Sequence, residues 1–286
     1  DGPVRGDLES LGIPVIVLGE RRHGIEALPW FLAEQARIRR RLAEIVHEYD
    51  IQIVQTHLLQ TLDFAALSLL REAPVRAVVW TIHNVDFLPQ GDRGWARLKR
   101  TAHVRLSRRH APRVGAVVAV SDRVRDAIRA ELGPMSDRIV TIANGVDVAR
   151  YRAERDRGGL ARELGVDPAA PLGLAVGRRT EQKGPRVLIE AARDHVEAPP
   201  RTRLLLVGEG ELESALREQA SAAGLGDHVR FLGVRQDVAR LLASVDVFVL
   251  PSLWEGLSIV LLEAMASAAP VVATAVSGTD QALVDG

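Results

Sequence analysis

The stretch Leu172-Gly173-Leu174-Ala175-Val176-Gly177-Arg178-Arg179-Thr180-Glu181-Gln182-Lys183-Gly184-Pro185 decides the fold of this chain. Its opening run is apolar and ends at a glycine, which predicts a buried strand, and Pro185 suits the first turn of a helix. A strand, a loop and a helix start in this order are typical of a βαβ unit in a parallel sheet. Only two of the 37 cationic residues are lysines, Lys99 and Lys183. A lysine in this loop therefore indicates a functional role. Lys183 and the planar fork of Arg178 both suit a phosphate, and a solvated basic loop is the alternative interpretation.

A second loop, Pro251-Ser252-Leu253-Trp254-Glu255-Gly256-Leu257-Ser258, follows a strand-like run and precedes a helical pattern from Ile259 to Ala268. Ser258 stands at the expected N-cap, and the nearby N–H groups are expected to form an anion site at the helix start. Glu263 follows Glu255 by eight residues, and both carboxylates are able to accept hydrogen bonds from a polyol. Surface helices also carry glutamates at this spacing, so the pair alone favours no ligand.

Strand-like and helical patterns alternate on both sides of these loops and predict an α/β chain with two open sheets. In the first half, a helical pattern runs from Trp30 to Tyr49, and Ser121 is expected to N-cap the helix that ends at Gly133. We place a linker at Val146–Gly159 between two domains, 1–148 and 149–286. The expected strands are Ile13–Leu18, Ile51–Gln55, Ala77–Ile82, Ala116–Val120 and Ile139–Ile142 in the first half, and Leu172–Val176, Arg203–Val207, Val229–Leu232, Val247–Leu250 and Val271–Ala273 in the second.

Length and composition narrow the class of protein. The 286 residues are 47% hydrophobic and 26% charged, which predicts a folded chain of more than one domain. Lys plus Arg and Asp plus Glu both number 37, so no overall basic field indicates a nucleic-acid partner. The absence of cysteine excludes disulfides and fits a reducing compartment, for which the cytoplasm is the expectation. Apolar runs are too short to span a membrane, and no signal-peptide pattern opens the chain.

Two classes of cofactor are not favoured. Gly208-Glu209-Gly210 is similar to the start of a dinucleotide fingerprint, but Glu213 stands where its third glycine belongs. The eight histidines form no metal-spaced cluster, and no two aspartates are separated by a single residue. We therefore expect neither a nicotinamide cofactor nor a metal.

Taken together, the motifs resemble family 4 retaining glycosyltransferases. The resemblance implies the GT-B fold, in which two Rossmann-like domains face each other across a cleft. It also implies a nucleoside-diphosphate sugar as the donor, and a glycan, lipid or small-molecule hydroxyl as the acceptor, with no catalytic metal. The matching motifs are Gly177-Arg178 with Lys183-Gly184, Pro251-Ser252 with Glu255-Gly256-Leu257-Ser258, Leu262-Glu263-Ala264-Met265-Ala266, Pro270-Val271-Val272-Ala273, Thr81-Ile82-His83-Asn84, Val118-Ala119-Val120-Ser121, and Ile142-Ala143-Asn144-Gly145-Val146-Asp147.

The resemblance implies a role for each matched residue. Arg178 and Lys183 hold the diphosphate and neutralise the charge that grows on the leaving group, which is electrostatic catalysis. Glu255 binds hydroxyls of the transferred sugar, and Glu263 binds the ribose. His83 approaches the sugar and the acceptor, although a lone histidine after a strand is otherwise expected to be a packed or capping residue. Phosphate and base contacts are implied for Gly256, Leu257, Ser258 and Val234.

The chain departs from the family pattern at Ala268 and Ser277, where the family has glycine, and at Gln281, where it has glutamate. In the family a first strand with a glycine-rich loop precedes the Ile13–Leu18 region, and further elements follow Gly286. We therefore expect a chain that is truncated at both ends and has little or no transferase activity. Two alternatives stay open, a non-catalytic nucleotide-sugar-binding protein and a GT-B-fold sugar-nucleotide epimerase.

A basic stretch at 93–109 has two interpretations. Trp95, Leu98, Ala102 and Leu106 fall on one helical face among cations, a pattern compatible with an anionic membrane surface. The alternative is a helix that packs this face on its own domain. The first interpretation predicts a cytoplasmic protein that binds peripherally to the inner face of the membrane.

Overall fold

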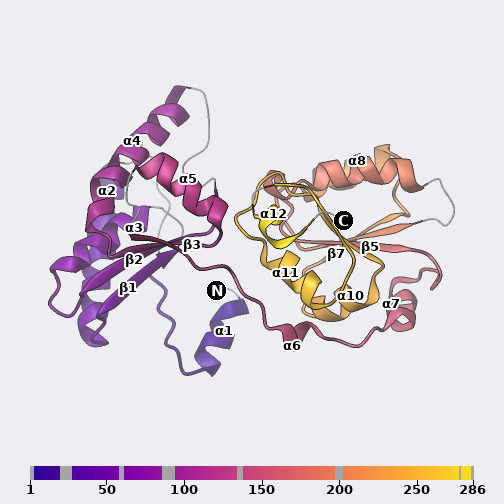
Figure 1. The fold of residues 1–286 in the computed structure, drawn as a ribbon, viewed down its shortest axis with the longest axis horizontal. Coiled ribbons are helices and arrows are strands. Elements are labelled where there is room, and N and C mark those ends of the chain that lie inside the picture. The colour runs from indigo at the N-terminus through magenta and orange to yellow at the C-terminus, as the bar shows by residue number, and fades with distance from the viewer. Residues whose placement is uncertain are drawn as a thin grey trace. The chain divides into compact units, whose positions relative to one another are not determined.

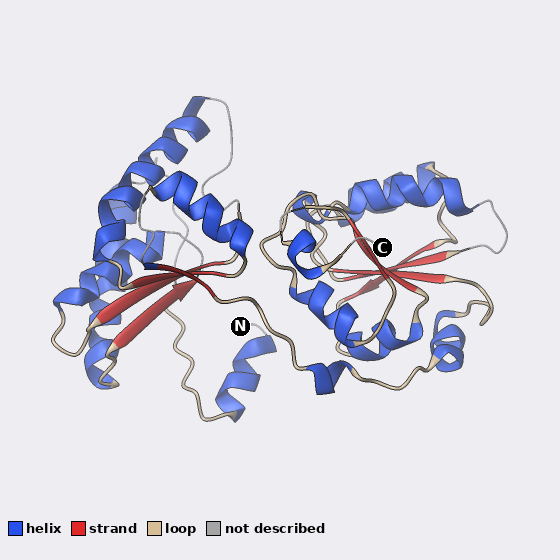
Figure 2. Ribbon diagram, in the orientation of Figure 1, coloured by secondary structure: helices blue, strands red, loops and turns tan. Residues whose placement is uncertain are grey.

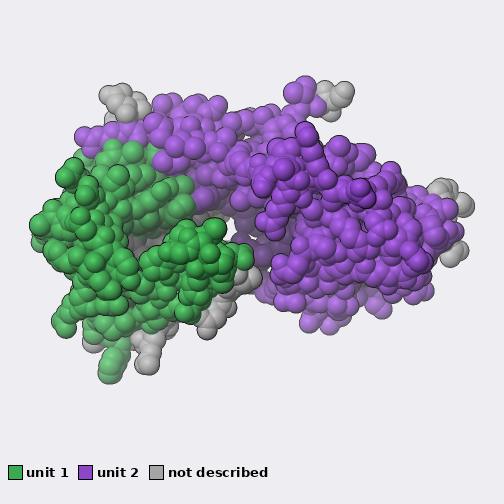
Figure 3. Space-filling model, turned by 90° about the horizontal axis from the view of Figure 1, so that it is seen from below, with its two compact units in different colours: residues 1–81, 109–117 green, residues 82–108, 118–286 purple. Residues whose placement is uncertain are grey.

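The computed structural model describes residues 3–19, 28–57, 61–85, 94–133, 138–196, 202–276 and 278–284. Helices and parallel strands alternate along the chain, as expected for an α/β protein (Figure 1, Figure 2). Two compact units are present, residues 1–81 with 109–117 and residues 82–108 with 118–286 (Figure 3). The predicted domains, 1–148 and 149–286, are segments expected to fold independently, and this division stays a prediction.

The first sheet has the strand order β1-β2-β3-β4. Strand β1 pairs in parallel with β2, from Ile53 opposite Ala77 to His57 opposite Thr81. Alternate residues Val78, Trp80 and Ile82 are buried, so one face of β2 lies in the core. The strands are β1 Ile53–His57, β2 Ala77–Ile82, β3 Ala116–Ala119 and β4 Ile139–Thr141.

One expected strand is wrong. Ile13–Leu18 adopts no regular secondary structure, and both Ile13 and Val17 are exposed. A strand needs a neighbour to take its N–H and C=O groups, and this segment pairs with no other strand among the described residues. The other nine expected strands are present, with ends within two residues of the prediction.

The helices of the first half follow their expected boundaries. The pattern from Trp30 to Tyr49 forms a helix, and Ser121 caps a later one by accepting the N–H of Val124 at 3.2 Å. That helix ends at Gly133, whose φ of 82° lies in the left-handed region that favours glycine. The helices are α1 Pro3–Ser10, α2 Leu28–Glu48, α3 Thr61–Ala66, α4 Gly94–His110 and α5 Asp122–Leu132.

The second sheet has the strand order β7-β6-β5-β8-β9, and its strands are parallel. Helix α8 covers one face, and α10 and α11 lie on the other (Figure 1). Leu174, Phe248 and Leu261 are fully buried in the core between sheet and helices. The strands are β5 Leu172–Val176, β6 Arg203–Val207, β7 Val229–Gly233, β8 Val247–Leu250 and β9 Val271–Ala273, and the helices are α8 Pro185–Val196, α9 Glu213–Ala222, α10 Val238–Ser244, α11 Ile259–Ala266 and α12 Thr279–Ala282.

The strand order reverses at β5, whose two neighbours are β6 and β8. Connections leave the two strands β5 and β8 toward opposite sides, which opens a crevice at their carboxyl ends where doubly wound proteins bind ligands. The segment expected to be the linker, Val146–Gly159, contains helix α6 (Val148–Tyr151) and the start of α7 (Arg157–Leu164).

Candidate active site

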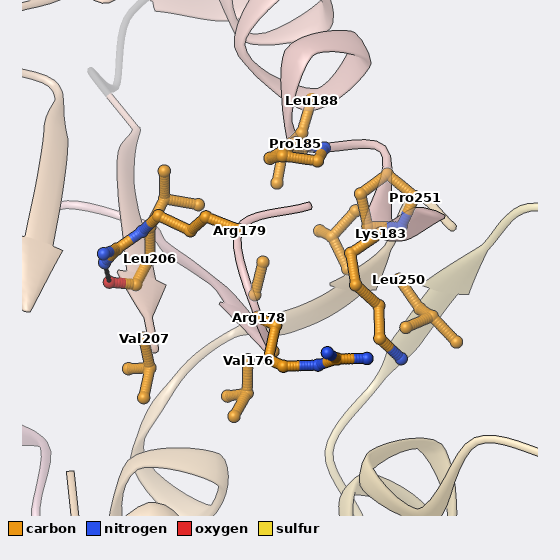
Figure 4. A pocket seen from close by; sticks show the side chains of 13 residues that line it. Val176, Arg178, Arg179, Lys183, Pro185, Leu188, Leu206, Val207, Leu250 and Pro251 are labelled. Carbon is orange, nitrogen blue, oxygen red and sulfur yellow. Dashed lines mark hydrogen bonds between the residues drawn. The ribbon is translucent and has the colours of Figure 1, made fainter. Parts of the chain in front are cut away.

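A cavity lies at this reversal point, at the carboxyl ends of β5, β6 and β8 (Figure 4). The loop after β5 provides its charged groups, and the ends of β6 and β8 provide apolar walls. Strands that are distant in sequence therefore meet around one hollow, as parallel topology predicts. The lining includes Val176, Gly177, Arg178, Arg179, Lys183, Leu206, Val207, Leu250 and Pro251.

Arg178 and Lys183 line this cavity, and Lys183 pairs with Glu255, which is not itself among the lining residues. The side chains of Arg178 and Lys183 point toward each other (Figure 4). Lys183 Nζ donates to Glu255 Oε1 at 2.5 Å, and the Glu255 side chain is only 7% exposed. Arg178 is exposed and makes no ion pair within the part of the chain that the structure describes. The cavity consequently has an excess of positive charge.

A buried hydroxyl holds the carboxylate in place. Ser252 Oγ donates to Glu255 Oε1 at 2.7 Å, so this oxygen accepts from both Ser252 and Lys183. Neither the composition nor the motifs indicated this role for Ser252. The signal was its spacing, since a serine three residues before a loop glutamate is within reach of its carboxylate.

The two loops that carry these residues are bound to each other. The N–H of Leu253 donates to the carbonyl of Gln182 at 2.8 Å, and Gln182 Nε2 donates to the carbonyl of Trp254 at 3.2 Å. Gly184 has a φ of 58°, and a Cβ there would overlap the carbonyl oxygen of Pro251. Only glycine fits this position, which brings Lys183 against the end of β8.

Sequence reasoning missed the part played by Arg179. Its side chain is 3% exposed, pairs with Glu213, and donates to the carbonyl of Leu206 at 3.1 Å. Its guanidinium also lies 5.2 Å from the ring centre of Phe231. Burial lowers the pKa of Arg179, and the charge of Glu213 opposes that shift. Arg179 therefore anchors the loop, while its neighbour Arg178 remains available to a ligand.

The glycines of Gly208-Glu209-Gly210 serve the same loop. A Cβ at Gly208 would overlap the carbonyl oxygen of Gly177, and one at Gly210 would lie 2.5 Å from the carbonyl oxygen of Arg179. The N–H of Arg179 donates to the carbonyl of Glu209 at 3.0 Å. Close packing of two loops accounts for both glycines.

The start of α11 matches the expectation in position but not in capping. Ser258 is the N-cap residue, yet its side chain makes no capping hydrogen bond, and its Oγ is buried with no hydrogen-bond partner among the described residues. The expected side-chain cap is therefore wrong. The first N–H groups of a helix have no acceptor within the helix, so this end offers donors to an anion.

The remaining predicted residues lie at different depths. Glu263 accepts a hydrogen bond from the hydroxyl of Tyr151 at 2.5 Å, and burial, followed by this bond, raises the pKa of Tyr151 to about 12. Val234 follows β7 and is 61% exposed. His83 follows β2, and its carbonyl oxygen occupies the place that a Cβ on Gly256 would need. Of the predicted site residues, only Arg178 and Lys183 line the cavity; the others are not among its lining residues, namely His83, Val234, Glu255, Gly256, Leu257, Ser258 and Glu263.

Two of the three departures now have a structural counterpart. Ala268 has a φ of 53°, in the left-handed region where a glycine carries no steric cost. Gln281 Oε1 accepts the N–H of Asp122 at 3.0 Å, which an amide oxygen does as well as a carboxylate. Ser277 lies outside the described residues.

Helix α4 does not bury its whole apolar face. Leu98 is 57% exposed and Leu106 is 40% exposed, so the interpretation in which this face packs on its own domain is wrong for these two residues. The side chain of Trp95 lies outside the described residues. No helix in the described ranges has the length and apolar character that crossing a membrane requires. Those ranges also contain no group of three potential metal ligands.

Comparisons with known proteins agree with this fold. The sequence model described as Glycosyltransferase Family 4 matches residues 6–150, and the one described as Glycosyl transferases group 1 matches residues 170–286. The computed fold superposes on the crystal structure of Anabaena HepE in complex with UDP-glucose with a TM-score of 0.79 and 25% identity, over 100% of this chain and 73% of the other. The architecture is the GT-B fold.

Two curated relatives are similar over about half of this chain. One is the Escherichia coli UDP-Gal:alpha-D-GlcNAc-diphosphoundecaprenol alpha-1,3-galactosyltransferase, 33% identical over 147 residues, which is 50% of this chain and 38% of the relative. The other is the alpha-maltose-1-phosphate synthase of Mycolicibacterium smegmatis, 38% identical over 182 residues, which is 60% of this chain and 46% of the relative. The aligned parts thus cover less than half of either relative.

Proposed function

The chain belongs to glycosyltransferase family 4, and we propose that it transfers a sugar from a nucleoside-diphosphate sugar to an acceptor hydroxyl with retention of configuration. The observation that supports this best is the cavity at the ends of β5 and β8, which Arg178 and Lys183 line and where Glu255 pairs with Lys183. A diphosphate is the group that such an excess of positive charge suits, because it brings two or more negative charges on tetrahedral oxygens.

The phosphate end of the donor is assigned to Arg178, Lys183 and the start of α11. In the transition state the bond from the sugar to the diphosphate breaks and negative charge grows on the leaving oxygen. Fixed cations and the N–H groups of Gly256, Leu257 and Ser258 stabilise that charge. These groups neutralise the diphosphate without a divalent cation, so a chelator such as EDTA should leave the transfer rate unchanged.

The sugar is assigned to Glu255. When the diphosphate attracts Lys183, the carboxylate held by Ser252 becomes an acceptor for sugar hydroxyls. The acceptor oxygen then bonds to the anomeric carbon on the face that the diphosphate leaves. The acceptor proton passes to a leaving diphosphate oxygen, which balances the step. His83 is assigned to the approach of the sugar and acceptor.

The nucleotide is assigned to Glu263 for the ribose and to Val234 for the base. We propose uridine as the base, because the structural relative HepE was solved in complex with UDP-glucose and the Escherichia coli relative is named for a UDP-galactose donor. Val234 follows β7 and is exposed, which supports its assignment to the base.

The acceptor is proposed to be a glycan, a lipid or a small molecule, met in the cytoplasm at the inner face of a membrane. The exposed Leu98 and Leu106 on α4, with Arg97, Arg105 and Arg109 nearby, provide an apolar and cationic surface for anionic lipid. Sedimentation with phosphatidylglycerol vesicles should carry the protein down, and vesicles of phosphatidylcholine should not. If the double variant Leu98→Glu and Leu106→Glu sediments as well as the wild type, this membrane assignment fails.

A thermal-shift screen tests the donor assignment. UDP-, GDP- and ADP-sugars are each added to the purified chain, and a ligand at a hundred times its Kd stabilises the fold by about 2.7 kcal/mol. No shift with any of them would refute the donor assignment. Incubation of the best donor with and without acceptors then separates the activities: product that needs an acceptor indicates transfer, and conversion without one indicates an epimerase. Binding of the donor without transfer and without conversion indicates a non-catalytic protein.

A further inference from the structure

Tyr151 holds one oxygen of Glu263. Its hydroxyl donates to Glu263 Oε1 at 2.5 Å, a length typical of a hydrogen bond to a charged oxygen. The two residues are separated by 112 positions and lie on different helices, α6 and α11. No motif in the sequence pairs them.

The tyrosine is itself fixed from several sides. Its ring is 9% exposed and packs in the core with Leu160, Leu172 and Leu261. Asp147 caps α6 by accepting the N–H of Ala149 at 3.0 Å, which sets the start of the turn that carries the ring. A buried tyrosine has only two side-chain torsions, so its hydroxyl is a rigid donor.

A second contact ties the same segment to the site. Asn144 Nδ2 donates to the carbonyl of Leu257 at 2.8 Å, at the start of α11. Asn144 and Tyr151 thus bind α11 at its beginning and one turn further on, within one compact unit. The segment between them acts as a strap that fixes the helix and the carboxylate together.

We propose that Tyr151 is a positioning residue that orients Glu263 for the vicinal hydroxyls of the nucleotide ribose. This inference rests on the ribose role proposed for Glu263. A glutamate carboxylate has about four lone-pair positions, of which the phenol occupies one. A free glutamate loses side-chain entropy when it binds, and the hydrogen bond from Tyr151 removes part of that cost before the nucleotide arrives.

Calorimetric binding of ribose and dideoxyribose nucleotides tests the proposal. UDP, GDP and ADP are each compared with their 2′,3′-dideoxy forms. For the ribonucleotide that binds most tightly, its affinity divided by the affinity of its dideoxy form is the discrimination ratio. The variants are Tyr151→Phe, which removes one oxygen atom, and Glu263→Ala, which removes the carboxylate. Tyr49→Phe is the matched control, because Tyr49 is the other tyrosine of the chain and is 45% exposed.

We expect Glu263→Ala to lower the discrimination ratio by tenfold or more and Tyr151→Phe to lower it about fivefold, with dideoxy binding unchanged in both. Tyr49→Phe should keep the wild-type ratio. A normal ratio in Tyr151→Phe, together with a lowered one in Glu263→Ala, overturns the positioning role and leaves the ribose role standing. A normal ratio in Glu263→Ala overturns the ribose role itself. If Tyr151→Phe fails to fold, Glu263→Gln replaces it. Its amide oxygen accepts from Tyr151, which places the NH2 group where the second carboxylate oxygen faced the ribose, so the ratio should fall and an unchanged ratio contradicts the proposal.

Discussion

Two clusters of charge in the second sheet region differ in their balance. Around α7 and α10, Arg235 and Arg240 face three carboxylates, Asp156, Glu163 and Asp237. Arg235 reaches Glu163 at 2.7 Å and Asp237 at 2.8 Å, and Arg240 reaches Glu163 at 2.8 Å and Asp156 at 3.0 Å. In this cluster each charge has a partner within the protein.

The cavity has the opposite balance, since both Arg178 and Lys183 line it, while the carboxylate of Glu255 pairs with Lys183. The chain as a whole has no net charge, so this local excess is a matter of placement. A matched network stabilises a fold modestly, whereas a cavity with an excess of cations attracts anions from solution. The comparison predicts that changes in the network alter stability and changes in the cavity alter binding.

The largest effect should come from the backbone that builds the cavity. Gly184→Ala places a Cβ on the carbonyl oxygen of Pro251 at a φ of 58°, so we expect a loss of about 3 kcal/mol in the free energy of unfolding. Gly224→Ala is the matched control, because its φ of 73° is similar and no atom lies within 4 Å of the new Cβ. Urea denaturation measures both variants. Equal losses would show that the contact with β8 does not constrain the loop.

The second effect has opposite signs for two ligands. Glu255→Gln removes the partner of Lys183, so UDP should bind about fivefold more tightly, while a UDP-sugar should bind about tenfold more weakly because its hydroxyls lose a charged acceptor. Glu163→Gln makes the same chemical change in the network and should alter neither affinity. Calorimetry measures the affinity of each variant for UDP and for the UDP-sugar. A parallel change in the two affinities of Glu255→Gln would argue against separate phosphate and sugar roles.

A smaller effect on stability is expected in the network. The hydrogen bond from Arg235 holds the pKa of Asp237 at about 2, below its ordinary value of 3.8. Because the folded pKa is the lower one, the stabilisation is present above pH 3.8 and is lost as the pH falls through 2. Arg235→Met should therefore cost about 1 kcal/mol at pH 7, after allowance for partial exposure, and this cost should disappear below pH 2. Denaturation curves across this range check it, and the affinity for UDP should not change.

The smallest effect concerns a departure from the family pattern. Ala268 has a φ of 53°, so Ala268→Gly should relieve strain and raise the free energy of unfolding by about 0.5 kcal/mol. Melting curves compare Ala268→Gly with Ala266→Gly. The second variant changes the last residue of α11 and should lower the free energy of unfolding by a similar amount. Destabilisation of equal size in both variants would mean that the left-handed conformation carries no strain.

The parts of the site that could be predicted are those where one short segment carries the information. The strand, loop and helix start around Lys183 are local, and so is the helix start at Ser258. The meeting of Lys183 with Glu255 depends on β5 lying beside β8, a neighbour relation that neither segment carries; the family resemblance implied only that both residues serve the donor. Ile13–Leu18 shows the converse, because a local strand pattern without a paired neighbour forms no strand.

Long-range pairs of side chains could not be predicted. The bonds from Tyr151 to Glu263 and from Asn144 to Leu257 join residues more than a hundred positions apart. Arg178 and Arg179 are identical in type and adjacent, yet one is exposed and the other is buried against Glu213 and Phe231. Which of two neighbouring arginines becomes buried depends on the partners that the fold brings to it, here Glu213 and Phe231.

The affinity of Lys183→Ala for UDP and for uridine, measured by calorimetry, tests the central claim that the unmatched cations of the cavity hold a diphosphate. The ammonium makes a charge-assisted contact, so its loss should weaken UDP binding about 30-fold and leave the affinity for uridine, which has no phosphate, unchanged. If Lys183→Ala binds UDP as tightly as the wild type, or loses uridine affinity to the same extent, the cavity is not the diphosphate site.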